Sequence, residues 1–196
     1  MRSRSGRDAG STAVSFPRMV KTIACAAVVL LATAGGIRPQ AGWAAAATKL
    51  PSWVKVDAAH RTVSLKITAA DGGANGTLNF NAYANGQMTV VVPAGWRVHI
   101  DFVNTGAGAL PHSLEVIRAV PASKIPPQAI PPAIPRAESR LLVAGIPPQQ
   151  TDSFDFTAQL AGQYLWFCGV PAHGTQGMWD RLIVSASAKV PSVTVK

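Results

Sequence analysis

Short stretches of alternating hydrophobic and polar residues fill most of the chain after residue 60. In 97–103, for example, Val98, Ile100 and Phe102 alternate with polar residues, so a strand here would have one apolar face. Similar stretches, separated by turn-forming residues, predict strands over 60–68, 78–86, 87–93, 97–103, 112–120, 140–146, 151–160, 163–170 and 181–187. No stretch of about 12 residues between them shows the apolar periodicity of a helix. The pattern therefore predicts an all-β fold, an antiparallel sandwich or barrel.

Two segments depart from simple alternation. Residues 163–170 (QYLWFCGV) are apolar on both faces, as is typical of a strand buried in the middle of a sheet. Residues 121–135 contain six prolines, which cannot donate a backbone N–H to a neighbouring strand. We therefore expect 121–135 to be an extended excursion on the surface.

The first 47 residues have the composition of a secretory signal peptide. Residues 22–36 are apolar or small, Arg18 and Lys21 precede them, and small residues suited to cleavage follow around Ala45–Ala47. The apolar run is shorter than the ~20 residues with which a helix crosses a bilayer, so cleavage is favoured over retention as a membrane anchor. We therefore expect 1–47 to be a targeting segment.

The rest of the chain, 48–196, would then be one exported domain. Either Met1 or Met19 can start the signal segment. The expected location is the periplasm or the outer face of the cytoplasmic membrane, with membrane association if the N-terminal segment is retained.

Charge is distributed unevenly between these two parts. The chain carries 18 Lys and Arg against 9 Asp and Glu, but six of the basic residues and one acidic residue fall in 1–47. The basic residues of 48–196 form no run that would grip phosphates, so we expect no nucleic acid binding. With 48% hydrophobic and 14% charged residues, the chain is also too apolar for a disordered polyelectrolyte.

Residues able to bind a soft metal ion gather in the last third of the chain. Cys168, His173 and Met178 follow one another at separations of five, and His112 precedes Cys168 by 56 residues. A thiolate, two imidazoles and a thioether form the ligand set of blue copper sites, whereas zinc sites more often use further Cys, His or carboxylate ligands. We therefore predict one type 1 copper ion, bound by His112, Cys168, His173 and Met178.

Other features of the region agree with a metal loop. Cys168 is the only cysteine of 48–196, so it has no partner for a disulfide within that domain. Small or bend-forming residues between the ligands allow the loop to fold back: Gly169, Pro171, Gly174 and Gly177. The two remaining histidines, His60 and His99, fall in a turn and on a polar strand face, where we expect exposure to solvent.

Three blocks of the sequence resemble the sulfocyanins, blue copper proteins of the cupredoxin family. The blocks are LNFNAYANGQMTVVVPAGWRVHIDFVN (78–104), LPHSLEV (110–116) and FCGVPAHGTQGMW (167–179). The spacing C-x4-H-x4-M also resembles that of the rusticyanins. The resemblance implies a Greek-key β-sandwich, the ligand set predicted above, and electron transfer in a respiratory chain. It also implies that the backbone N–H of Ser113 donates to the sulfur of Cys168.

The predicted function is that of a mononuclear copper protein, expected as a monomer, which shuttles single electrons between redox proteins of the cytochrome or terminal oxidase class. Copper enzymes such as nitrite reductases and multicopper oxidases need further histidine clusters, and only His60 and His99 remain, so we predict no enzyme activity. A copper carrier or storage protein is the alternative, although carriers tend to use exposed Met-rich or Cys-x-x-Cys sites. An Ig-like adhesion module would have no need of the ligand set.

Within the loop, His173 is the ligand expected to reach the surface, because the small residues beside it cannot cover its ring. Val170, Pro171 and Ala172 would then form an apolar patch suited to brief docking of a redox partner. Alternatively, these residues only bend the loop. The excursion 121–135 either lies beside this patch or is a solvated spacer.

Overall fold

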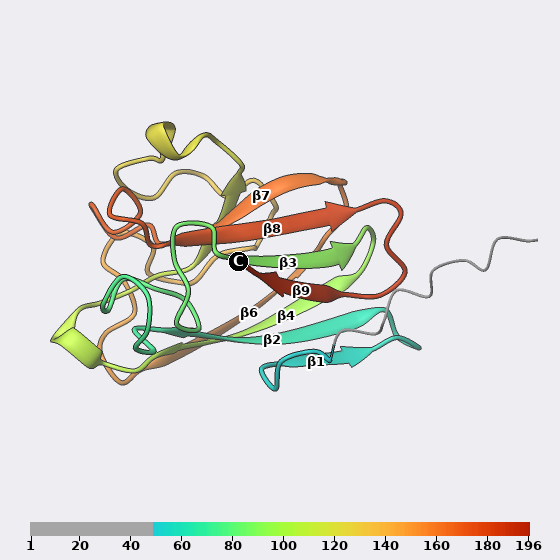
Figure 1. Cartoon of the computed structure of the whole chain (residues 1–196), viewed down its shortest axis with the longest axis horizontal. Coiled ribbons are helices and arrows are strands. Elements are labelled where there is room, and N and C mark those ends of the chain that lie inside the picture. Colours follow the sequence, from blue (N-terminus) through green and yellow to red (C-terminus); the bar gives the residue numbers. More distant parts are fainter. Residues whose placement is uncertain (1–48) are drawn as a thin grey trace, which may run out of the picture. The chain divides into compact units, whose positions relative to one another are not determined.

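A computed structural model describes residues 49–196 of the chain (Figure 1). The predicted signal segment 1–47 lies outside the described residues, so its role stays a prediction. Within 49–196, no helix is long and apolar enough to cross a membrane.

Nine strands in this part of the chain form two sheets that pack against each other (Figure 1). The first sheet has the strand order β1-β2-β4-β6, and the second has the order β5-β7-β8-β3-β9. The strands are β1 (Val54–Asp57), β2 (Thr62–Ala69), β3 (Met88–Pro93), β4 (Arg97–Asn104), β5 (Glu115–Arg118), β6 (Thr151–Thr157), β7 (Gly162–Phe167), β8 (Trp179–Ser185) and β9 (Ser192–Val195). The predicted β-sandwich is confirmed.

The chain passes repeatedly from one sheet to the other, as in a Greek key. Strand β3 belongs to the second sheet, although β2 and β4 before and after it are neighbours in the first. This crossing makes β2–β4 and β3–β8 parallel pairs, whereas the other five strand pairs are antiparallel. The predicted antiparallel pairing therefore holds for most pairs, but not for these two.

Alternation of apolar residues correctly predicted the strands that face the core. Val98, Ile100 and Phe102 of β4 are fully buried, and so are Val63, Leu65 and Ile67 of β2. In β7, four consecutive residues, Tyr164–Phe167, are buried, as predicted for a strand covered on both faces.

Two predicted strands are wrong. Residues 78–86 contain only isolated bridges, because Phe80 and Tyr83 pair across a tight turn and reverse the chain. Residues 140–146 form a turn in which the N–H of Gly145 donates to the carbonyl of Leu141 at 2.7 Å. Phe80 and Ile146 of these two segments are buried in the core, whereas Leu141 and Val143 are exposed.

The Pro-rich segment 121–135 is more than the surface excursion predicted for it. Ile125 packs in a small cluster with Ile117 and Leu165 on the outer face of β5 and β7, while Ile134 joins the main core. The segment thus covers the outer face of the second sheet, next to the end that carries the predicted ligands.

Candidate metal centre

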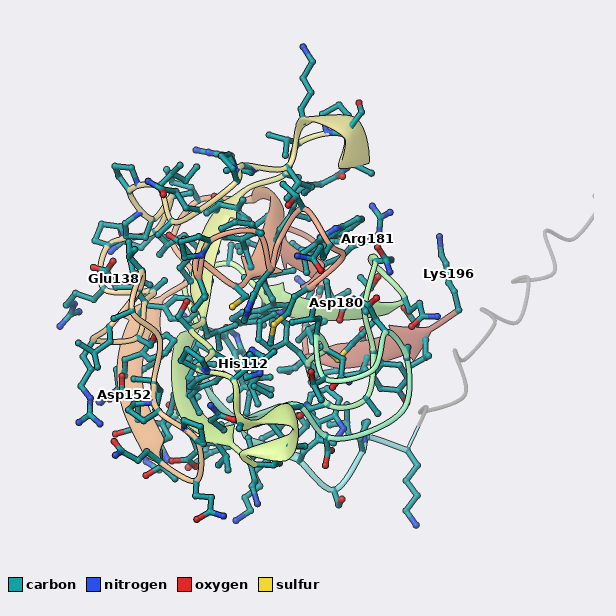
Figure 2. All side chains as sticks on the ribbon, turned by 90° about the vertical axis from the view of Figure 1, so that its left-hand side faces the viewer. His112, Glu138, Asp152, Asp180, Arg181 and Lys196 are labelled. Carbon is teal, nitrogen blue, oxygen red and sulfur yellow. The ribbon has the colours of Figure 1, made fainter. Side chains whose placement is uncertain are left out.

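The four predicted ligands lie next to strands of the second sheet or in the loop that joins two of them. His112 precedes β5, Cys168 follows β7 directly, and Met178 immediately precedes β8, while His173 lies in the loop between β7 and β8. Figure 2 looks onto this end of the sandwich, with His112 labelled near the middle of the molecule. The two ends of the loop are fixed because Phe167 and Trp179 are paired in the β7–β8 ladder.

Backbone hydrogen bonds fold the 168–178 loop back on itself. The N–H of Cys168 donates to the carbonyl of Met178 at 3.1 Å, and the N–H of Met178 donates to that of His173 at 3.0 Å. A further bond closes the first turn of the loop, from the N–H of His173 to the carbonyl of Val170 at 3.1 Å. These bonds hold the backbone of the three loop ligands together.

Three of the predicted ligands present their donor atoms to one point. The sulfur of Cys168 and one ring nitrogen each of His112 and His173 lie within 4.8 Å of one another. Cys168 Sγ is 3.6 Å from His173 Nδ1, and the two imidazole centroids are 5.0 Å apart. The side chain of Met178, the fourth predicted ligand, is fully buried in the same core as Cys168.

Burial sets the protonation of these groups. It lowers the pKa of His112 to about 4, with a smaller contribution from His173, and it lowers the pKa of His173 as well. Both rings are therefore neutral at pH 7, with a lone pair free to bind a metal. Burial raises the pKa of the Cys168 thiol to about 11. Metal binding at this sulfur must then displace its proton.

Within the described residues, the ring of His112 has no hydrogen-bond partner at either nitrogen, although both atoms are buried. Buried polar atoms without a partner are costly, and most of those in native proteins are satisfied. A metal bond to one nitrogen of His112 removes part of this cost. The donor set, two neutral imidazoles and a thiol within a dry cage, fits copper.

Ser113 organises the surroundings of the sulfur, as the resemblance to sulfocyanins implied. Its backbone N–H donates to Cys168 Sγ at 3.4 Å. Its hydroxyl group donates to the carbonyl of Leu142 at 2.7 Å and accepts from the N–H of Gly169 at 2.9 Å. An N–H directed at the sulfur stabilises a thiolate relative to a thiol.

Sequence analysis missed two buried carboxyl groups near the centre, Glu115 on β5 and Asp180 on β8. Burial raises the pKa of each to about 7. One oxygen of Asp180 accepts from the N–H of Met88 at 2.9 Å. The backbone N–H of Ile130 acts against this rise in the pKa of Glu115. Within 49–196, however, the carboxyl oxygens of Glu115 make no hydrogen bond of ordinary geometry. A single acid within an apolar strand (HSLEVI, MWDRLI) was the signal available in the sequence.

The other two histidines lie apart from the centre. The exposed ring of His60 is 2.7 Å from Asp57, and the half-buried ring of His99 lies between Asp101 and Asp155 on the first sheet. The predicted exposure to solvent therefore holds for His60, whereas His99 is only partly exposed.

Comparison with known families is decisive about the class of protein. The family described as the sulfocyanin (SoxE) domain matches residues 49–195, nearly all of the described chain. The chain belongs to the sulfocyanin family. Membership of this family makes it a blue copper protein of the cupredoxin class, which binds one copper ion and acts in electron transfer. The predicted resemblance, fold and cofactor are thus confirmed.

The chain is also similar to individual proteins. The sulfocyanin of Sulfolobus acidocaldarius is 26% identical over 141 residues, which cover 69% of this chain and 70% of that protein. The rusticyanin of Acidithiobacillus ferridurans is 30% identical over 54% of each chain, so the match spans about half the length of that relative. Among solved structures, a dithionite-reduced auracyanin from Roseiflexus castenholzii has 23% identity and a TM-score of 0.46, covering 62% of this chain and 96% of its own.

Proposed function

We propose that His112, Cys168, His173 and Met178 hold the copper, and that the chain shuttles single electrons between redox protein partners. The convergence of one thiol and two neutral imidazoles within 4.8 Å carries this proposal. Bound copper supplies a one-electron couple between Cu(I) and Cu(II). The buried surroundings would keep water away from that couple, and the backbone bonds of the loop would hold the ligand residues in place.

His173 gives the site its contact with solvent. The residue is itself nearly buried, with 8% of its surface exposed, whereas His112, Cys168 and Met178 are completely buried. The adjacent Pro171 and Ala172 are exposed. An electron that leaves through the edge of His173 therefore crosses very little protein before it reaches the partner.

Exposed apolar side chains occur on the segments that contact the ligand segments. Seven large hydrophobic side chains are exposed within 49–196, and four of them lie on segments that contact the ligand segments: Leu110, Ile130, Leu141 and Val143. The Pro-rich segment joins the same surface, because the N–H of Ala172 donates to the carbonyl of Pro127 and the N–H of Ala129 donates to that of Gly169, both at 2.8 Å. Small apolar contacts of this kind suit brief encounters between redox proteins.

Ala172→Glu is expected to slow electron exchange without altering the copper spectrum. The new carboxylate would lie next to His173, the one proposed ligand with any exposed surface, and would have to lose water when a partner docks. The measurement is the rate of electron self-exchange and of exchange with a soluble cytochrome. Ala172→Gln is the matched control, since it adds the same bulk without charge. Equal rates in wild type and both variants would place the exit elsewhere.

Met178→Leu is expected to retain copper and colour and to raise the reduction potential. Leucine fills the buried volume but has no sulfur to favour Cu(II) as a weak fourth ligand. Protein film voltammetry or a redox titration measures the shift. A lowered potential would contradict the proposed role of Met178.

The burial of the site also separates this function from that of a copper carrier. Carriers exchange their metal through accessible ligands, whereas three of the four proposed ligands here have no exposed surface. A redox site requires a metal that stays in place, and a closed cage provides it.

We further propose that 1–47 directs the domain to the periplasm or to the outer face of the cytoplasmic membrane, where it serves, as a monomer, partners of the cytochrome or terminal oxidase class. The basic, apolar and small-residue order of this segment supports the proposal. We expect the native protein to begin near Ala46–Thr48. N-terminal sequencing that finds Met1 or Met19 instead would indicate a retained anchor.

A further inference from the structure

The stretch NFNAYANG (79–86) lies between β2 and β3, and the copper ligands do not explain it. Its first two asparagines are buried and shape the stretch itself. Asn79 Nδ2 donates to the carbonyl of Gly76 at 2.6 Å, while Asn81 donates to the carbonyl of Lys66 and accepts from the N–H of Thr68. These partners lie on β2 and in the loop that follows it. Asn79 and Asn81 therefore anchor the stretch to the first sheet.

The third asparagine, Asn85, belongs to a tight turn, here called the 84–87 turn. The N–H of Gln87 donates to the carbonyl of Ala84 at 3.1 Å and closes this turn. Asn85 and Gly86 within it both have positive φ, at 56° and 74°. Asparagine and glycine are the residues that tolerate this conformation best, which explains why the pair occurs here.

The 84–87 turn binds the backbone on both sides of Met178. The N–H of Asn85 donates to the carbonyl of Gly177 at 2.9 Å, and the N–H of Gly86 donates to the carbonyl of Trp179 at 3.0 Å. In Figure 1, this green segment before β3 passes beside the start of β8. The two hydrogen bonds flank the proposed ligand, and neither uses the N–H or the carbonyl oxygen of Met178 itself.

Side-chain packing leaves little room for movement at this contact. A Cβ atom on Gly177, whose φ is 99°, would overlap the side chain of Asn85. A Cβ atom on Gly86 would lie 2.6 Å from the ring of Trp179. The turn and the end of the metal loop therefore fit each other closely.

We propose that the 84–87 turn is the positioning element for the Met178 thioether. A thioether would bind copper only weakly, so the metal–sulfur bond by itself would not fix where the sulfur of Met178 lies. The backbone on either side must do so, and the turn holds that backbone at Gly177 and Trp179. This inference rests on the proposed function, because it takes Met178 to be a ligand.

Asn85→Val tests the inference, because a β-branched residue is strongly disfavoured at a φ of 56° and the turn should open. We expect the reduction potential to rise toward that of Met178→Leu. In the copper-free protein, the amide groups of 177–179 should exchange with solvent faster. Asn85→Gly keeps the backbone conformation and should retain the wild-type potential.

Two further variants separate the proposed effect on the potential from a general loss of stability. Gly86→Ala places a methyl group against Trp179, so it should displace the turn and raise the potential even if Asn85→Val does not fold. Asn81→Gly is the matched control, since it removes two buried hydrogen bonds of the same stretch away from Met178. It should lower the unfolding temperature and leave the potential unchanged.

The decisive comparison combines the variants with Met178→Leu. In the Met178→Leu protein, which lacks the sulfur, Asn85→Val should produce no further shift in potential. If the turn only supported the fold, Asn85→Val would shift the potential equally with and without the sulfur. A shift in Met178→Leu together with an unchanged potential in both Asn85→Val and Gly86→Ala would overturn this inference alone. Additive shifts would do the same. An unchanged potential in Met178→Leu would overturn the ligand assignment, and this inference with it.

Discussion

Replacement of Cys168 by serine is expected to abolish the intense visible absorption of the Cu(II) protein while leaving the sandwich folded. The absorption arises from charge transfer between a thiolate and Cu(II), and Cys168 provides the only thiol among the described residues. The loss should therefore be complete rather than partial. Absorption spectra of the copper-loaded variant, recorded with its copper content, measure the effect.

The fold should survive because the core does not depend on this sulfur. Serine has nearly the same volume, and the N–H of Ser113 that now donates to the sulfur can donate to a hydroxyl group instead. Circular dichroism and thermal unfolding of the copper-free variant check this point. His60→Gln is the control, because His60 is exposed and hydrogen-bonded to Asp57. An unchanged visible band in Cys168→Ser would disprove the proposed sulfur ligand.

Glu115→Gln is expected to change how stability depends on pH. Burial raises the pKa of Glu115 from about 4.5 to about 7, so the folded protein holds a proton that the unfolded chain releases. This contribution to stability is fully present below about pH 4.5 and is lost as the pH rises through about 7. Across this window, the free energy of unfolding of the wild type should fall by roughly 1.4 kcal/mol per pH unit relative to that of the variant.

Denaturant unfolding of both copper-free proteins between about pH 4 and pH 8 measures this difference. The other ionisable groups are common to both proteins, so the comparison isolates the effect of the Glu115 carboxyl group. Glutamine leaves a buried amide in place of the acid. This amide changes the free energy of unfolding of the variant by an amount that does not depend on pH. Parallel stability curves would show that Glu115 does not hold a proton in the folded state.

The proposed ligands could be selected from the sequence because metal chemistry depends on residue type and spacing. Cys168, His173 and Met178 recur at intervals of five in a loop whose ends are fixed by paired strands. His112 is distant in the sequence, but it shortly precedes strand β5, the neighbour of β7, which brings it to the same end of the sheet. The alternation of apolar and polar residues in β2 and β4 also predicted these strands, since one face of each strand is buried.

The missed and mistaken elements have physical causes. The edge strands β1 and β9 have four residues each, which is too short to show alternation. Residues 78–86 look like a strand by composition, but Asn81 and Ala82 adopt positive φ and reverse the chain. The parallel pairs and the burial of Ile125 depend on contacts between distant segments, which no local pattern records.

Electron paramagnetic resonance of the Cu(II)-loaded wild-type protein, with one copper per chain established by metal analysis, tests the central claim most directly. If Cys168, His112 and His173 bind the ion as proposed, the unpaired electron is shared with the sulfur. The copper hyperfine splitting should then be narrow, and the intense visible band should disappear in parallel on reduction. A wide splitting with only weak visible absorption, as given by copper bound through nitrogen and oxygen alone, would contradict the proposed centre.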